Sequence, residues 1–261
     1  MLPPDRTLQS RHECKYFLPE DRVPALRALI RPFMRPDRFA SRSPGYRYTL
    51  SSLYLDSPDL DLLRSTEEGH KNRFKLRIRS YSDDSAQPVF VEIKRRIDGI
   101  VRKARSALER DHLASVLGGG EGNEGFGALP PNAAEFVHLV RELGARPTMH
   151  VRYEREAYEA IGGAPVRVTL DRGLSRATAR DWQPRLGGGD YRRTPLPGVI
   201  LEVKFTDSSP PWVQDLVSRL ELQRRSIPKY VLCLHAALAR GEIPGRRSTA
   251  REAPSRRTDH G

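Results

Sequence analysis

The segment 72–81 alternates apolar and cationic side chains from Arg73 to Arg79. A period of two places alternate residues on opposite faces of a β-strand, so the segment predicts a strand with one apolar and one cationic face. Like charges at this spacing repel each other, which favours a fold that places anions against the cationic face. The apolar side chains are Phe74, Leu76 and Ile78, and the cationic ones are Arg73, Lys75, Arg77 and Arg79.

A second strand is expected at 88–95, after the turn residues 82–87. Its apolar residues alternate with Glu92 and Lys94. Taken alone, this hairpin also fits a half-exposed sheet whose solvent face is basic. Recurrence of the pattern in other strands distinguishes the two interpretations.

The pattern recurs along the chain. About eight segments alternate like strands, and most of them carry Lys or Arg opposite their apolar residues. The expected strands are 11–18, 49–56, 72–81, 88–95, 100–108, 149–158, 166–171 and 199–206. Three of them have Glu two positions before Lys: Glu13/Lys15, Glu92/Lys94 and Glu202/Lys204.

Two details stay open at this level. The segment 100–108 separates its faces poorly, so Arg102 and Lys103 compete for the cationic face and Lys103 is favoured only slightly. Asp56 and Asp171 end their strands, where each fits either a cap of the next element or a salt-bridge partner.

Closing about eight antiparallel strands into a barrel puts one face inside and removes the sheet edges. With the cationic face inside, the apolar face lies outside and needs helices to cover it. The sequence therefore predicts an α+β fold, an eight-stranded antiparallel β-barrel with flanking helices. The expected helices are 19–30, 57–66, 109–117, 132–143, 209–222 and 228–238, and the expected loops are 31–48, 118–131 and 172–198.

The net charge agrees with an anionic partner. Lys and Arg number 45 against 33 Asp and Glu, a formal charge of +12. Such a balance predicts nucleic acid, an acidic membrane surface or phosphate compounds as partners. Nucleic acid is the weaker interpretation, because the basic residues lie on alternating strands rather than on a patch interleaved with aromatics.

The remaining composition predicts a cytoplasmic protein. Cys14 and Cys233 are the only cysteines, which excludes a disulfide framework and a cysteine-based zinc site. The first ten residues lack the apolar core of a signal peptide, and the most apolar stretch, 230–239, is too short to span a bilayer. We expect one domain at 10–239, an N-terminal extension at 1–9 and a disordered basic tail at 240–261.

The order of motifs resembles the VTC domain over about residues 10–238. This is the polyphosphate polymerase domain of the vacuolar transporter chaperone complex, within the triphosphate tunnel metalloenzymes. The motifs are Arg11-X-Glu13-X-Lys15-Tyr16, Ser52-Leu53-Tyr54-Leu55-Asp56, Lys75-X-Arg77-X-Arg79-X-Tyr81, Glu92-Ile93-Lys94, Tyr153-X-Arg155, Arg167-Val168-Thr169-Leu170-Asp171, Glu202-Val203-Lys204 and Lys229-Tyr230.

The resemblance implies a tunnel that binds triphosphate with Mn²⁺ or Mg²⁺ and moves the γ-phosphate of ATP onto a polyphosphate chain. Glu202 would hold the metal and Tyr153 would contact phosphate. The residues that would bind phosphates are Lys15, Arg77, Arg79, Lys94, Lys103, Arg155, Arg167 and Lys229. Within this set, Arg77, Arg79, Lys94 and Glu202 are the expected catalytic residues.

Three further residues join the expected site from their place on the cationic strand faces. Lys75 and Lys204 are expected to bind the substrate, which would be ATP and polyphosphate or triphosphate. Glu13 is a second candidate metal ligand, although pairing with Lys15 or another cation explains it equally well. The sequence does not indicate an oligomeric state.

Phosphoryl transfer fits these residues without a protein nucleophile. It requires in-line positioning and neutralisation of the phosphoryl oxygens, which Arg, Lys and a divalent ion supply. One hydroxyl contact of the family is missing, because its Ser-Lys-Tyr is Pro228-Lys229-Tyr230 here. Two alternatives stay open: a metal-dependent tripolyphosphatase or nucleoside triphosphatase, and a polyphosphate-binding module without turnover.

Overall fold

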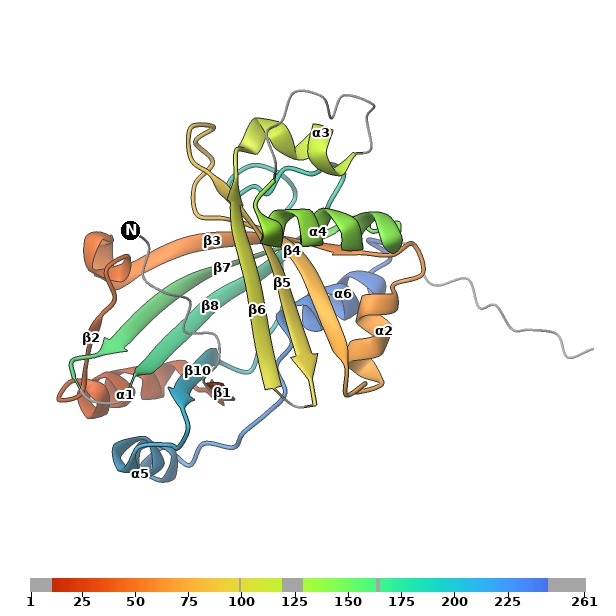
Figure 1. The fold of residues 1–261 in the computed structure, drawn as a ribbon. Helices are drawn as coiled ribbons and strands as arrows, with labels where there is room; N and C mark the ends of the chain where they lie inside the picture. The colour runs from red at the N-terminus through yellow and green to blue at the C-terminus, as the bar shows by residue number, and fades with distance from the viewer. Residues whose placement is uncertain (1–10, 99, 119–128, 163–164, 244–261) are drawn as a thin grey trace, which may run out of the picture.

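The computed structural model describes residues 11–98, 100–118, 129–162 and 165–243, which form one ten-stranded antiparallel sheet with helices around it (Figure 1). The strands are β1 (Arg11–Leu18), β2 (Met34–Pro36), β3 (Arg47–Asp56), β4 (Arg73–Ser80), β5 (Val89–Ile97), β6 (Ile100–Leu108), β7 (Arg146–Ala160), β8 (Val166–Thr178), β9 (Arg192–Arg193) and β10 (Val199–Thr206). The α-helices are α1 (Val23–Ile30), α2 (Asp61–Glu67), α3 (Leu113–Leu117), α4 (Pro131–Glu142), α5 (Pro211–Arg219) and α6 (Lys229–Leu238). Short 3₁₀ turns are η1 (Glu20–Arg22), η2 (Ala40–Arg42), η3 (Pro44–Tyr46) and η4 (Arg110–His112).

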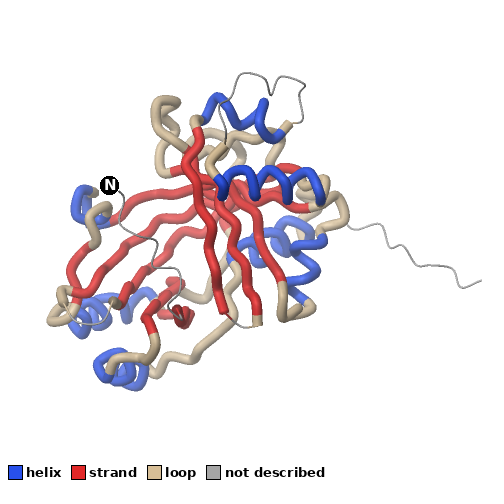
Figure 2. The backbone as a smooth tube through the Cα atoms, viewed as in Figure 1, coloured by secondary structure: helices blue, strands red, loops and turns tan. Residues whose placement is uncertain are grey.

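The main path of the sheet contains the eight expected strands, in the order β1-β10-β8-β7-β3-β4-β5-β6. Figure 2 shows how it curls, with β4–β6 crossing in front of β3, β7 and β8. The ends of the path, β1 and β6, come within 8 Å of each other between Cα atoms, yet no ladder joins them among the described residues. The α+β architecture and its eight-stranded antiparallel path are confirmed, but no hydrogen-bonded ladder among the described residues closes the path into a full barrel.

The free edge of β1 has another partner. The backbone N–H of Arg225, in the segment between α5 and α6, donates to the carbonyl of Lys15 at 2.8 Å. This contact satisfies a strand-edge carbonyl that a ladder to β6 would otherwise use. At the gap between β1 and β6, here called the seam, the segment between α5 and α6 thus forms part of the tunnel wall.

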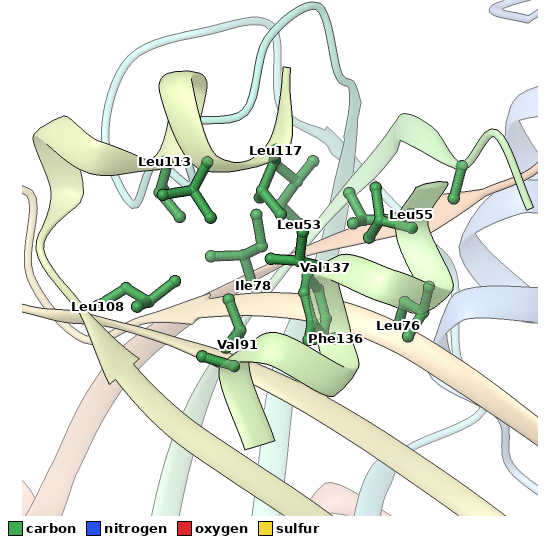
Figure 3. Packing of buried hydrophobic residues seen from close by; sticks show 14 of the residues in the cluster. Leu53, Leu55, Leu76, Ile78, Val91, Leu108, Leu113, Leu117, Phe136 and Val137 are labelled. Atoms are coloured by element: carbon green, nitrogen blue, oxygen red, sulfur yellow. The ribbon is translucent and has the colours of Figure 1, made fainter. Parts of the chain in front are cut away.

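The outer face of the sheet is apolar, as alternation requires, and helices cover it in two places. On β3–β6, buried residues such as Ile78 and Val91 pack against Phe136 of α4 and Leu117 of α3 (Figure 3). On β1, β8 and β10, Val168 and its neighbours pack against α1 and α5. These two cores turn the cationic face inward.

The third core lies on the concave side of the sheet. Helix α6 lies behind β4 and β5 in Figure 1 and contacts β7 and β8. Its Tyr230 and Leu234 pack with Tyr54 of β3 and Tyr153 of β7. The ring of Tyr230 stacks on Tyr54 with centroids 4.8 Å apart. Helix α6 therefore fills part of the interior and brings its first residue, Lys229, to the tunnel.

The helix expected at 57–66 begins later, at Asp61. The Asp56 carboxylate accepts hydrogen bonds from the N–H groups of Leu62 and Leu63, at 2.9 and 3.0 Å, and from the Tyr230 hydroxyl at 2.8 Å. Asp56 is therefore a cap at the start of α2, one of its two expected roles.

Other boundaries also differ. The expected loop 31–48 contains β2, η2 and η3, and the expected loop 172–198 contains the end of β8 and all of β9. Glu242, expected in the disordered tail, forms an ion pair with the buried Arg176 at 2.7 Å. The extension 1–9, the rest of the tail at 244–261 and most of the loop 118–131 lie outside the described residues. No helix in the described part of the chain is long and apolar enough to cross a membrane.

Candidate functional site

The concave face of the sheet encloses a cavity of about 440 Å³. Strands β1, β3, β4, β5, β7 and β10 line it together with the segment 224–230. Cationic side chains far outnumber the two lining carboxylates, Glu13 and Glu202. The cationic lining residues are Lys15, Arg73, Lys75, Arg77, Arg79, Lys94, Arg95, Arg96, Arg155, Lys204, Arg224, Arg225 and Lys229.

One part of the cavity, here called the arginine cluster, consists of Arg77, Arg79, Arg155 and Lys229 with the counterions Glu92 and Asp171. Glu92 is fully buried and lies 2.6 Å from an Nη of Arg77 and 3.9 Å from an Nη of Arg79. Burial opposes its ionisation, but these two arginines and Lys103 hold the pKa of Glu92 well below its usual range. The guanidinium of Arg77 is thereby fixed against a buried carboxylate, and that of Arg79 is held beside it by a hydrogen bond to the Ser52 hydroxyl at 3.2 Å.

Asp171 fixes the other half of the arginine cluster. It accepts two hydrogen bonds from Arg155, at 2.6 and 2.8 Å, and its second oxygen lies 2.7 Å from Nζ of Lys229. Burial lowers the pKa of Lys229, but the charge of Asp171 outweighs this and raises it. Asp171 is therefore a salt-bridge partner, not a cap.

The hydroxyl of Tyr153 joins the two halves. It lies 3.4 Å from Arg79 and 3.3 Å from Arg155, within hydrogen-bonding distance of both guanidinium groups. The Tyr153 ring lies 4.9 Å from Nζ of Lys229. Four cationic or hydroxyl donors thus converge on one space, an arrangement suited to the oxygens of a phosphoryl group.

A second part, here called the lysine cluster, consists of Lys15, Lys75, Lys94 and Lys204 with Glu13 and Glu202. Glu13 lies 2.8 Å from Lys15 and 3.0 Å from Lys94, and Glu202 lies 2.9 Å from Lys204. Burial, then repulsion from Lys15, lowers the pKa of Lys94 to about 8. These ammonium groups sit on flexible stems and carry charge less securely than the arginines.

Lys75 has no carboxylate within ion-pair distance among the described residues. Burial lowers its pKa to about 7, and Lys15, Lys94, Arg73 and Arg77 add to the effect by repulsion. The structure thus places a half-buried amine among cations, with no counterion from the described part of the chain. An anionic ligand is the chemical complement of this position.

The two carboxylates of the lysine cluster fit a divalent metal. Glu13 and Glu202 lie close together across β1 and β10, because Nζ of Lys204 is 3.8 Å from the first carboxylate and 2.9 Å from the second. Mg²⁺ and similar ions commonly use one or two carboxylates and complete their shell with water and substrate phosphates. No group of three or more His, Cys, Asp or Glu ligands occurs among the described residues. The donor set therefore fits a metal held jointly with phosphate, not an all-protein site.

The structure brings most of the expected site residues into the cavity. Glu13, Lys15, Lys75, Arg77, Arg79, Lys94, Tyr153, Arg155, Glu202, Lys204 and Lys229 all line it. Lys103 points to the same side, because its Nζ lies 2.7 Å from Glu92, so Lys103 rather than Arg102 faces inward. Arg167 shares the inner face as the cross-strand partner of Lys204, but it is not among the lining residues; its side chain is 42% exposed and pairs with Asp37 at 2.5 Å.

Several lining residues were not among the expected site residues. Arg105 does not line the cavity itself but lies 3.5 Å from Glu92 behind it, and its alternation with Lys103 was the available signal. Arg224 and Arg225 belong to an irregular segment, which has no period to mark its facing side. Tyr54 lines the cavity beside Arg77, at 3.2 Å.

Comparison with known proteins gives one family match over most of the chain. A family model described as the VTC domain matches residues 10–238. The vacuolar transporter chaperone complex subunit 4 of Schizosaccharomyces pombe is 25% identical over 270 residues, a match covering 86% of this chain and 36% of that protein. The chain thus spans little more than a third of this curated relative.

Solved structures with a similar arrangement are more distant in sequence. One is a Bacillus halodurans protein described as a candidate adenylate cyclase, with a TM-score of 0.46, 12% identity, and coverage of 84% of this chain and 95% of that one. Another, a candidate adenylyl cyclase from Hippeastrum described as having a dominant triphosphatase activity, has a TM-score of 0.44, 15% identity, and coverage of 89% and 96%.

Proposed function

The chain belongs to the VTC domain family, and on that premise we propose that it transfers the terminal phosphate of ATP to the end of a polyphosphate chain. The observation that carries this proposal is the cation-rich cavity, in which Lys75 has no counterion among the residues that the structure describes. Polyphosphate is a linear polyanion without bases, and it matches a row of inward cations better than nucleic acid does.

The arginine cluster is suited to the reacting phosphoryl group. Arg79, Arg155 and Tyr153 present fixed donors to one point, so they need little rearrangement when charge develops on the equatorial oxygens. Guanidinium groups bind phosphate in a forked geometry. Glu92 and Asp171 hold two of these forks in place before the substrate arrives.

The lysine cluster is suited to the rest of the chain of phosphates. Lys15, Lys75 and Lys94 can follow successive phosphates as mobile point charges. The acceptor is the ionised end of a phosphate chain, so no protein group has to remove a proton from it. Positioning and charge neutralisation therefore supply the catalysis.

Glu13 and Glu202 would hold Mn²⁺ or Mg²⁺ together with substrate oxygens. The bound ion would neutralise phosphate charge and orient the transferring group. Lys204 and Lys15 contact these carboxylates and would have to share or give up those contacts when the metal binds. This exchange leaves their ammonium groups free for phosphate.

The direct test incubates the purified protein with ATP and Mn²⁺ and stains a gel for polyphosphate. We expect polymer that grows with time and is abolished by Arg79→Ala. Arg219→Ala, at an exposed ion pair of α5, is the matched control and should behave as wild type. Free phosphate without polymer would identify a triphosphatase, and binding without either product would identify a binding module; each result refutes the polymerase.

A further inference from the structure

An aromatic cluster lies at one end of the tunnel and has no role in phosphate binding. It consists of Phe39, Tyr48, Tyr81 and Phe90. The rings of Phe39 and Tyr81 are nearly parallel, with centroids 6.3 Å apart and planes 8° apart. Tyr48 lies 6.4 Å from Phe39 and 6.3 Å from Tyr81, and Phe90 lies 5.9 Å from Tyr81.

Two of these rings are open to solvent. Phe39 is 51% exposed and Tyr81 is 37% exposed. Phe39 lies in the segment between β2 and η2, near the start of β3 (Figure 1). Large apolar side chains left exposed side by side, next to a charged cavity, indicate a binding surface.

The aromatic cluster is directly continuous with the arginine cluster. Phe90 is the cross-strand partner of Arg79, and Tyr48 is the cross-strand partner of Arg155. Directly paired residues have Cβ atoms about 5 Å apart. Tyr81 follows two residues after Arg79 on the same face of the chain. A group attached to a phosphate on Arg79 and Arg155 therefore reaches these rings.

Cations also surround the aromatic cluster. The guanidinium of Arg105 lies 3.6 Å from the centroid of Phe90 and 5.8 Å from that of Tyr81, and that of Arg38 lies 4.7 Å from Phe39. Burial raises the pKa of Tyr81, but Arg79 and Arg105 outweigh this and lower it. The surface thus combines flat rings with positive charge, as sites that stack nucleic-acid bases do.

We propose that the aromatic cluster is the docking surface for the base of a nucleoside triphosphate whose phosphates occupy the arginine cluster. The proposal rests on the proposed function in one respect, the binding of triphosphate in the tunnel. It also gives the tunnel a direction: the nucleoside lies at the Phe39 end, and the phosphates point toward the lysine cluster.

The surface stacks the base without reading its edge. The Asp37 carboxylate beside it already accepts the N–H groups of Phe39 and Ala40, at 3.0 and 2.7 Å, and pairs with Arg167. The Ser43 hydroxyl donates to the carbonyl of Phe39 at 3.3 Å. Because every base has a flat face, stacking alone accepts different bases. ATP and GTP are therefore expected to bind with similar affinity.

The test compares the binding of ATP and inorganic tripolyphosphate to the full chain by calorimetry, with EDTA present to prevent turnover. Phe39→Ala should weaken ATP binding about tenfold, the effect of losing one stacking contact, and leave tripolyphosphate binding unchanged. Phe39→Trp should retain ATP affinity. Phe33→Ala is the matched control: Phe33 is 42% exposed and stacks on Trp212 away from the tunnel.

The outcomes separate this proposal from the polymerase. Equal effects of Phe39→Ala on ATP and tripolyphosphate, or no effect on either, overturn the base-docking surface. A GTP affinity more than about tenfold from that of ATP overturns base-independent stacking. Normal, Phe39-dependent ATP binding with no polymer overturns only the polymerase. A wild type that binds neither ligand, both in EDTA and with Mg²⁺ restored, overturns both.

Discussion

The arginine cluster and the lysine cluster line the same cavity, yet their charges are held in opposite ways. In the arginine cluster burial disfavours the charged form, but Glu92 raises the pKa of Arg77 and Asp171 raises that of Arg155. In the lysine cluster burial and repulsion prevail at two positions, where the pKa of Lys75 falls to about 7 and that of Lys94 to about 8. The arginine cluster is charged and oriented without ligand, whereas Lys75 depends on an anionic ligand for its full charge.

The contrast teaches how such a tunnel can be stable while empty. Glu92 and Asp171 fix guanidinium groups of the arginine cluster, and Glu13 and Glu202 pair with three of the four lysines of the lysine cluster. Among the described residues of the lysine cluster, Lys75 has no carboxylate within ion-pair distance. Buried cations without counterions destabilise the fold unless they lose their protons. Lysine can lose its proton near neutral pH and arginine cannot, so an uncompensated lysine such as Lys75 costs the empty fold less than an arginine at the same position would.

The largest expected effect tests the arginine cluster. Arg79→Ala should lower the turnover of polyphosphate synthesis by about 10²–10³, the effect of removing one preformed donor to a developing charge. Arg79→Lys should recover little of it, because one ammonium cannot replace the fork. Lys15→Ala, in the lysine cluster, should cost less. Equal losses for Arg79→Ala and Lys15→Ala in steady-state kinetics would remove the distinction between the clusters.

The second prediction concerns the counterion. Glu92→Gln leaves Arg77 buried without its partner, which should lower the free energy of unfolding by about 3 kcal/mol. Glu135→Gln, at the exposed pair with Arg95, is the control and should change it by less than about 1 kcal/mol. Urea denaturation without ligand measures both. A Glu92→Gln variant as stable as the control would show that the arginine cluster needs no internal anion.

The third prediction uses pH to separate the clusters. Lys75 and Lys103 have pKa values of about 7, and binding a polyanion should return their protons. Affinity for tripolyphosphate should therefore fall as pH rises above 7, by about tenfold per pH unit for each proton taken up. Lys75→Arg should flatten this profile. If the affinity of Lys75→Arg for tripolyphosphate depends on pH as steeply as that of wild type, a group other than Lys75 takes up the proton.

The stability of the empty protein should change with pH in the opposite sense. Between pH about 7 and the unfolded lysine pKa of 10.5, the unfolded chain holds more protons on these lysines than the folded one. The contribution of Lys75 and Lys103 to the free energy of unfolding therefore rises with pH across that window. The contribution of Lys75 is the difference in the free energy of unfolding between wild type and Lys75→Met, measured by urea denaturation at several pH values. If this difference does not change with pH, the pKa of Lys75 is not lowered.

The smallest expected effect is thermal. Tripolyphosphate at a hundred times its Kd should stabilise the protein by about 2.7 kcal/mol, which raises the Tm by several degrees. Lys75→Met should raise the Tm of the empty protein and reduce the shift caused by tripolyphosphate, since it removes the uncompensated charge. Differential scanning calorimetry measures both. A wild-type Tm that does not respond to millimolar tripolyphosphate would contradict anion binding in the tunnel.

Much of this architecture follows from alternation in the sequence. The inward face of β4 was predictable because Lys75, Arg77 and Arg79 alternate with buried Leu76 and Ile78. On β6 alternation was ambiguous, and only the register that pairs Lys94 with Lys103 decides which residue faces inward. Register depends on neighbouring strands, so one strand taken alone does not contain it.

The misses have identifiable physical causes. Alternation gives the face of a strand residue but not its position along the tunnel or its partners: Arg167 shares the inner face with Lys204, as expected, yet its side chain pairs with Asp37. Arg224 and Arg225 line the cavity from a segment without any period. Closure of the barrel depends on the approach of β1 and β6, which lie at opposite ends of the sheet path and have no local signal.

The seam between β1 and β6 has a topological consequence. Across it the described structure shows the hydrogen bond from Arg225 to Lys15 and the ion pair between Glu13 and Lys94, but no β-ladder. A polymer threaded through a sealed ring can leave only by sliding out past one of its ends. Here the wall can be parted by breaking side-chain contacts and a single backbone bond. A long chain inside this protein is therefore enclosed without being topologically locked.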